Sequence, residues 1–320
     1  MTETPLPRRN VQVVTTMTAC GYARYGRWMI ESFDRHWATD VQLLVYTEGF
    51  DLTPASPRIR VFDLEERCDG LVAFKRRHAA NPEAHGRLPW WSVRLGLRES
   101  VHGGRRLKVL GRGYRWDAVR FSHKVFATLD AARTSGADVL IWIDADTRFF
   151  ADVCRDRTEG FVPEGRFVGC LKRASAHTEC GFVAYDLTND ATQAMLRDLA
   201  AMYDSDALFA EEEYHDSYLF DVVRERQERA GHVSHDIAEG IGDRAHHVLI
   251  NSPLGTFMDH MKGECKEQRS ASKNLVVDRG ESYWRVPISP TEARPRSRFG
   301  RAKPTPGSRG VSPSRRPRRP

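Results

Sequence analysis

Two aspartates, Asp144 and Asp146, follow the apolar run VLIWI with a single alanine between them. Side chains two positions apart on an extended chain point the same way, so both carboxylates can reach one point. Mg²⁺ and Mn²⁺ are bound by one or two carboxylates, with substrate phosphates and water completing the shell. The pair therefore indicates a cation that bridges the protein and a diphosphate, provided that it ends a buried strand.

The spacing by itself does not identify a metal site, because the chain contains a second triplet of the same form, Asp204-Ser205-Asp206. That triplet lies in MYDSDALF, where a helical pattern ends, so we interpret it as a solvated turn with capping aspartates. Only the position behind an apolar run distinguishes the first pair from the second.

A segment far downstream offers the partners that such a site requires. His260, Gly263 and Lys266 have the spacing H-x-x-G-x-x-K within NSPLGTFMDHMKGECK. The imidazole can complete a metal site with the two aspartates, the glycine lets backbone amides approach an anion, and the lysine neutralises phosphate charge.

The elements that must position these residues are predicted from hydrophobic periodicity. Helices are expected at 27–37 and 212–230 and behind the capping residues Asp117 and Asp190, whereas GYARYG (21–26) reads as a turn and 81–115 as an insertion or mobile loop. Strands are expected at 11–18, 41–48, 58–65, 139–143, 166–171 and 180–187.

This order of elements predicts an α/β fold. The chain opens with a β-α-β pattern, which favours a parallel sheet covered by helices. Five consecutive apolar residues at 139–143 indicate a central strand buried on both faces. In open parallel sheets, ligands bind at the carboxyl ends of the strands, where Asp144 and Asp146 fall.

Charge is distributed unevenly along the 320 residues. The chain carries a net charge of +6, but residues 294–320 contain nine arginines, one lysine and no acidic residue, which leaves −4 for the rest. We expect a disordered N-terminus (1–10), one folded domain (11–290) and a disordered Arg/Pro-rich tail (291–320), since the tail has little apolar content.

The cysteines and the apolar runs indicate the cellular compartment of the protein. Six scattered cysteines form no C-x-x-C pair, and no signal-peptide pattern or long apolar run is present. We therefore expect free thiols, a cytoplasmic location and no membrane span.

Taken together, these motifs resemble the GT-A fold of nucleotide-sugar glycosyltransferases, in particular the glycogenin and lipopolysaccharide galactosyltransferase family and enzymes associated with bacterial and phage genomes. An apolar strand ending in D-x-D, with H-x-x-G-x-x-K far downstream, carries the resemblance. Three further segments between those points are similar to family motifs in the expected order: FSHKVFATL, TECGFVAYDL and YHDSYLFD.

The resemblance implies a mixed, mainly parallel sheet flanked by helices, a divalent cation (Mn²⁺ or Mg²⁺) and a nucleotide-diphosphate sugar as donor. Asp216 would lie near the anomeric carbon, and Glu179 near the sugar or acceptor. The remaining residues divide into metal ligands, namely Asp144, Asp146 and His260, and groups that meet the diphosphate, namely Lys124, Lys262, Gly263 and Lys266.

Two positions depart from the family pattern. Lys266 precedes EQRS where the family has Pro-Trp, and Glu179 stands where it has Asn. Whether the sugar keeps or inverts its anomeric configuration, and which role Glu179 has, are therefore left open.

The acceptor is also open at this point. Ten uncompensated positive charges favour binding to nucleic acid or another polyanion, so a modified base of phage DNA, a protein and a glycan are all candidate acceptors. Two other classes compete: a non-enzymatic nucleic-acid-binding protein on a degenerate transferase scaffold, and a two-metal nuclease, which would need more clustered carboxylates than these motifs supply.

Overall fold

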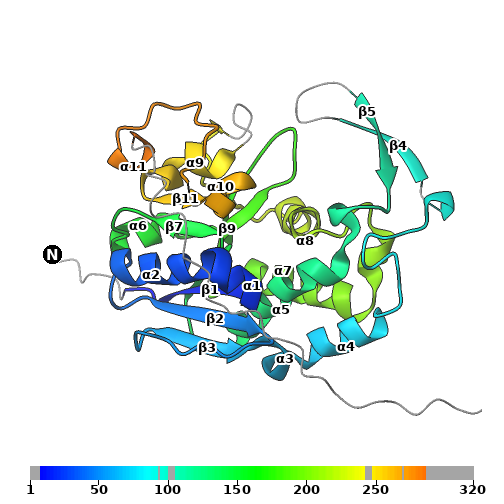
Figure 1. Ribbon diagram of the computed structural model, residues 1–320, viewed down its shortest axis with the longest axis horizontal. Helices are drawn as coiled ribbons and strands as arrows, with labels where there is room; N and C mark the ends of the chain where they lie inside the picture. Colours follow the sequence, from blue (N-terminus) through cyan, green and yellow to red (C-terminus); the bar gives the residue numbers. More distant parts are fainter. Residues whose placement is uncertain (1–7, 93, 100–104, 242–246, 269, 286–320) are drawn as a thin grey trace, which may run out of the picture. The chain divides into compact units, whose positions relative to one another are not determined.

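A computed structural model describes residues 8–285 except 93, 100–104, 242–246 and 269; the side chains of 94, 96–99 and 105–110 are not described. The chain divides into two units, 1–287 and 288–320, and the second lies outside the described residues. Within the first unit the described strands form a seven-stranded sheet and two small two-stranded sheets. Figure 1 shows the helices arranged around the large sheet.

The large sheet is mixed and mainly parallel, in the strand order β10-β8-β9-β6-β1-β2-β3. Its neighbours pair parallel except for β9, which runs antiparallel to both β6 and β8. This confirms the predicted α/β class. The strands are β1 (Val11–Thr18), β2 (Gln42–Glu48), β3 (Ile59–Asp63), β6 (Val139–Ile143), β8 (Val168–Leu171), β9 (Glu179–Asp186) and β10 (His235–Asp236).

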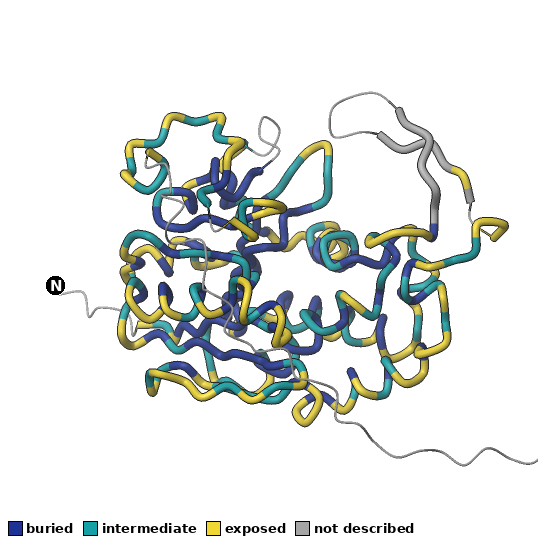
Figure 2. Tube along the Cα trace, viewed as in Figure 1, coloured by how far each residue is buried: buried dark blue, intermediate teal, exposed yellow. Residues whose placement is uncertain are grey.

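Residues of the sheet contribute to two hydrophobic cores, one on each face. Figure 2 shows that the central strands are largely buried. Strand β6 contributes Leu140 and Trp142 to one core and Ile141 to the other, and all five of its residues are buried. The first core is closed by α4 (Asp69–Arg77), α5 (Ala118–Thr134), α7 (Asp190–Asp204) and α8 (Asp216–Arg229). The second is closed by α2 (Arg27–His36), α9 (Val248–Asn251), β7 (Thr147–Phe149) and β11 (Met258–His260).

The remaining elements are short. They are α1 (Ala19–Gly21), η1 (Tyr22–Gly26), α3 (Leu64–Arg67), η2 (Trp90–Ser92), β4 (Arg94–Glu99), β5 (Arg105–Leu110), η3 (Tyr114–Trp116), α6 (Arg155–Glu159), η4 (Ala207–Ala210), η6 (Pro253–Thr256), α10 (Glu264–Gln268) and α11 (Ser282–Arg285).

The prediction of a turn at GYARYG is wrong, because these residues form the helical segments α1 and η1, which lead into α2. Gly21 and Gly26 have ordinary right-handed backbone angles, with φ of −61° and −59°. Gly26 is needed for close packing instead, since a Cβ there would lie 2.5 Å from Met17 Sδ.

The irregular segment expected at 81–115 contains an antiparallel hairpin of β4 and β5. The strand register pairs Leu95 with Val109 and Leu97 with Leu107. This alternation was obscured in the sequence by the arginines and glycines between the apolar positions.

Two helix starts also differ from expectation. Helix α8 begins at Asp216 rather than at Glu212, because Glu211 and His215 have extended backbone angles. Helix α7 is capped by Asn189, whose side chain accepts from the amide of Ala191, rather than by Asp190.

Other predictions concern the chain ends and the cysteines. Of the expected disordered N-terminus, residues 8–10 are described, and Arg9 Nη1 donates to the carbonyl of Val162 at 2.8 Å. The tail 291–320 lies outside the described residues. All six cysteines are free thiols, as expected. Among the described residues, no helix is both long and apolar enough to cross a membrane.

Candidate active site

Asp144 is held at the carboxyl end of β6 by backbone and side chain. Its amide donates to the carbonyl of Gly181 on β9 at 3.0 Å, which fixes the chain as it leaves the sheet. Trp142 Nε1 donates to Asp144 Oδ1 at 2.7 Å. One carboxylate oxygen is thus oriented by an indole from the same strand.

His260 reaches the two aspartates through the pairing of β7 with β11. These strands of three residues run antiparallel, with His260 opposite Thr147. Met261 adds a hydrogen bond from its amide to the carbonyl of Asp146, 3.0 Å long. His260 Nε2 consequently lies 3.0 Å from Asp146 Oδ1 and 3.6 Å from Asp144 Oδ2.

Two lysines neutralise this acidic pair. Lys266 Nζ lies 3.1 Å from Asp146 Oδ2, and Lys124 Nζ lies 3.2 Å from Asp144 Oδ1. Burial alone would raise the pKa of Asp146, but His260 and Lys266 outweigh it and hold that pKa well below its usual range. Burial lowers the pKa of His260, and Asp146 outweighs this effect, so the net shift is upward.

Lys124 joins Asp144 to a third carboxylate, Asp216, the first residue of α8. Its ammonium lies 2.7 Å from Asp216 Oδ2 and also donates to the carbonyl of Cys180. Burial lowers the pKa of Lys124, but Asp144 and Asp216 raise it by more than burial lowers it, so the net shift is upward. The pKa of Asp216 is raised by burial but lowered more strongly by Lys124.

Glu179, at the start of β9, lies on the other side of the His260 ring. Its carboxylate accepts from Lys262, and its Oε1 is 3.9 Å from His260 Nδ1. Burial raises the pKa of Glu179, but Lys262 and His260 outweigh it, so the group is strongly acidic. Lys262, expected near the diphosphate, therefore contacts Glu179.

Gly263 has a conformational role. Its φ is +58°, a left-handed conformation that favours glycine, and a Cβ would meet nothing within 4 Å. The turn at Gly263 leads into α10, which carries Lys266 to Asp146. The structure thus brings together Asp144, Asp146, His260, Lys266, Lys124 and Asp216, with Glu179 and Lys262 beside them.

The donor set fits a divalent cation. One ligand atom from each of Asp144, Asp146 and His260 lies within 4.8 Å of the others. Two carboxylates and an imidazole match the ligands of Mn²⁺, and two carboxylates alone match Mg²⁺. The side chains of Asp144 and Asp146 are partly exposed, so water or a ligand can reach them.

Three residues that support the site were not identified from the sequence. Trp142 orients Asp144, and His247 Nε2 donates to the carbonyl of His260 at 2.7 Å. Gly181 leaves room for the His260 ring, because a Cβ there would lie 2.6 Å from it. Of these, only Gly181 had a sequence signal, as a small residue inside an expected strand.

No protein-family model and no curated protein matches the chain. Among solved structures, it is similar to mouse xyloside xylosyltransferase 1 (10% identity, 76% of this chain and 93% of that one, TM-score 0.41). It is also similar to the glycosyltransferase GlyE of Streptococcus pneumoniae TIGR4, with 13% identity over 84% of this chain and 58% of that one and a TM-score of 0.43. A third similar structure is the bifunctional glycosyltransferase WbbM, with 15% identity over 69% of this chain and 38% of that one and a TM-score of 0.34.

Proposed function

We propose that this chain is a GT-A-type glycosyltransferase that uses a divalent cation to transfer a sugar from a nucleotide-diphosphate sugar. The observation that carries the proposal is the 3.0 Å approach of His260 Nε2 to Asp146 Oδ1. It brings the D-x-D and H-x-x-G-x-x-K motifs, distant in sequence, into one donor set.

Asp144, Asp146 and His260 would hold the cation, preferably Mn²⁺ because the set mixes oxygen with imidazole nitrogen. When bound, the cation stabilises the negative charge that develops on the departing diphosphate. Lys266 and Lys124 are already adjacent to its ligands and would turn their ammonium groups toward the donor phosphates.

Asp216 would face the anomeric carbon. Its salt bridge to Lys124 keeps it ionised, which favours stabilisation of an oxocarbenium-like centre over proton abstraction, since a carboxylate of low pKa is a poor base. Glu179 is also ionised and is held by Lys262 at the far side of His260, where we assign it to positioning the sugar or acceptor.

The acceptor is a DNA base, a protein or a glycan. The ten positive charges of residues 294–320 favour a polyanionic acceptor such as a modified base in phage DNA. The net charge of −4 in the rest of the chain argues against DNA as the acceptor unless a local basic surface contacts it. The free cysteines are compatible with work in the cytoplasm.

The test is a panel of nucleotide-diphosphate sugars, assayed for Mn²⁺-dependent hydrolysis and for thermal stabilisation of the protein. We expect one donor to be hydrolysed slowly and to raise the melting temperature only with Mn²⁺ or Mg²⁺. Asp146→Asn and His260→Ala should lose both responses, whereas Asp206→Asn, in the second D-x-D triplet, should keep them.

Two results would reject the proposal. One is the absence of any metal-dependent response across the donor panel. The other is an Asp146→Asn variant that hydrolyses the donor as fast as the unaltered protein does.

A further inference from the structure

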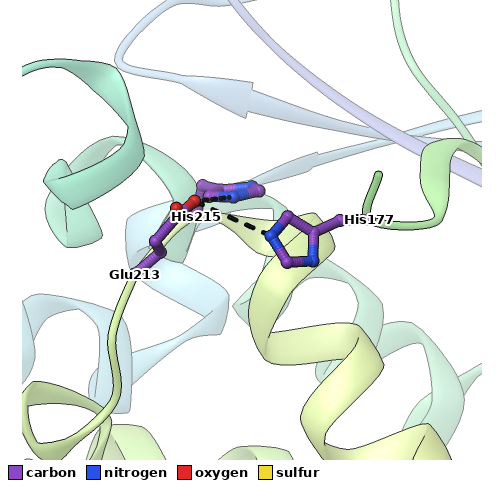
Figure 3. A group of neighbouring side chains, drawn as sticks. All are labelled: His177, Glu213 and His215. Atoms are coloured by element: carbon purple, nitrogen blue, oxygen red, sulfur yellow. Dashed lines mark hydrogen bonds and ion pairs between the residues drawn. The ribbon is translucent and has the colours of Figure 1, made fainter. Parts of the chain in front are cut away.

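A second group of metal-ligand side chains lies outside the donor set described above. It consists of His177, from the segment between β8 and β9, and of Glu213 and His215, from the extended segment before α8. Figure 3 shows both imidazoles beside the Glu213 carboxylate. Their three ligand atoms lie within 4.8 Å of one another.

The distances from the two imidazoles to Glu213 differ. His215 Nε2 lies 2.8 Å from Glu213 Oε2, a hydrogen bond. His177 Nε2 lies 3.9 Å from the same oxygen, too far for a hydrogen bond. Ligand atoms bound to one cation at about 2.0–2.2 Å are roughly 3–3.5 Å apart, so small movements would place all three around an ion.

The opposite nitrogen of each ring also faces a carboxylate. His177 Nδ1 is 3.4 Å from Asp221 Oδ2, and His215 Nδ1 is 3.9 Å from Asp216 Oδ1. Metal-binding histidines characteristically donate their second N–H to a carboxylate, which fixes the tautomer and aims the other nitrogen at the ion. His177 therefore has Nε2 directed at Glu213 and Nδ1 at Asp221, whereas His215 Nδ1 lies near Asp216 but beyond hydrogen-bond distance.

The carboxylates in this arrangement are themselves held in place. Glu213 is fully buried, and Arg115 Nη1 lies 3.0 Å and 3.3 Å from its two oxygens. Asp221 accepts from the Thr178 amide at 3.0 Å and from Arg224 Nη2 at 2.9 Å. These contacts hold the two carboxylates in place before any ion binds.

We propose that His177, Glu213 and His215 bind a late first-row divalent cation, Zn²⁺ in particular. Two imidazoles with one carboxylate favour Zn²⁺ over Mg²⁺ and Mn²⁺, whereas the two aspartates of the first site favour the harder ions. Three protein ligands leave a fourth position for water, as in open zinc sites. The partly exposed His177 gives the ion access from solvent.

This inference does not require glycosyl transfer, and its test measures binding alone. Metal-free protein is equilibrated with Zn²⁺, passed through gel filtration and analysed for bound metal; Co²⁺ is titrated in parallel, with its visible absorption as readout. The Asp146→Asn variant lacks one carboxylate ligand of the first donor set, so the one equivalent of Zn²⁺ expected to remain on it is assigned to the second group.

Adding His177→Ala to Asp146→Asn should abolish that equivalent and the Co²⁺ absorption. His232→Ala, which changes an exposed histidine elsewhere, should leave both unchanged. The proposal is overturned if Asp146→Asn retains no Zn²⁺, or if it retains the ion after His177 is removed. Near-ultraviolet circular dichroism checks that each variant is folded, and His177→Gln replaces His177→Ala if that variant is not.

Discussion

Lys124 links two carboxylates of the site. Its ammonium contacts both Asp144 and Asp216, so Lys124→Met leaves two carboxylates without that partner. We expect the free energy of unfolding at neutral pH to fall by about 3–5 kcal/mol, as when one partner of a buried ion pair is removed. Denaturant titration measures this loss.

The pH dependence of that loss has a defined sign. Burial raises the pKa of Asp216, and Lys124 outweighs burial and lowers it. A lowered pKa contributes stability above the unfolded value of about 3.9, and this contribution disappears as pH falls. In the variant, burial acts without Lys124 and raises the pKa of Asp216, so the difference between the two proteins should begin to shrink above about pH 4 and continue to shrink below it.

The control is Lys172→Met, which removes a more exposed pair with Glu228. Its cost should stay below about 1 kcal/mol. Equal losses in the two lysine variants would contradict the role assigned to Lys124.

Gly181 provides a second test at the residue scale. A Cβ at this position would lie 2.6 Å from the His260 ring, so Gly181→Ala must displace the imidazole or strain β9. We expect a loss of about 1–3 kcal/mol in unfolding free energy, as for other overpacked positions. Mn²⁺ affinity, followed by electron paramagnetic resonance, should fall with it.

Gly280→Ala is the matched control, since its Cβ would meet nothing within 4 Å and its φ is not left-handed. It should leave both Mn²⁺ affinity and stability unchanged. Unaltered Mn²⁺ binding in Gly181→Ala would show that the His260 ring position is not needed for the cation.

At the scale of elements, the two D-x-D triplets have different partners. Asp206 follows α7 with a φ of +61° and accepts from Arg77 at the end of α4 and from His78. Asp206 thus links the end of α7 to the end of α4. The prediction of a solvated turn with capping aspartates did not include this structural role. Asp144 and Asp146 instead follow a buried strand of the central sheet.

Asp206→Ala should therefore lower the free energy of unfolding by about 1–3 kcal/mol through lost charged hydrogen bonds. Asp206→Asn should lose less, because asparagine tolerates the left-handed conformation. Asp204→Ala, at an exposed position in the same triplet, should stay within about 0.5 kcal/mol. Denaturant titration ranks the three variants, and equal effects of Asp204→Ala and Asp206→Ala would contradict this assignment.

The sheet could be predicted from sequence because its strands are continuous or alternating apolar runs. VLIWI is one example, and its burial on both faces follows from having no polar residue. The hairpin of β4 and β5 escaped prediction because its apolar positions are separated by charged and glycine residues. Glycines at 21 and 26 suggested a turn, although they serve close packing.

The site was less predictable than the sheet. Asp144 and Asp146 were identified from their place behind β6, and His260 from its spacing with Gly263 and Lys266. The contact between the two groups depends on β7 and β11, strands of three residues that carry no periodic signal. The cluster around Glu213 was missed because its members lie in irregular segments, and acidic residues near a helix start are ordinary.

At the scale of the whole molecule, charge separates the chain into an acidic body and a basic segment. Residues 294–320 carry ten positive charges and lie outside the described residues. These charges would neutralise DNA phosphates and release their counterions, which makes the binding sensitive to salt. Removing the segment should therefore eliminate salt-sensitive binding to double-stranded DNA. Fluorescence anisotropy across a range of salt concentrations measures this binding.

Donor hydrolysis with Mn²⁺ should be unaffected by the same truncation, since none of the proposed site residues lies in the removed segment. Equal DNA affinity before and after truncation would assign the binding to the folded part instead.

The pairing of β7 with β11 also has a consequence for the order of folding. Phe149 and Met258 are partners across a long stretch of chain, and such pairings form slowly because distant segments must first meet. A refolding chain should therefore regain helical circular dichroism before it regains Mn²⁺ affinity, which stopped-flow mixing can resolve. Simultaneous recovery of the two signals would contradict this order. Cation binding then reports that β7, from the middle of the domain, has paired with β11, from its C-terminal part.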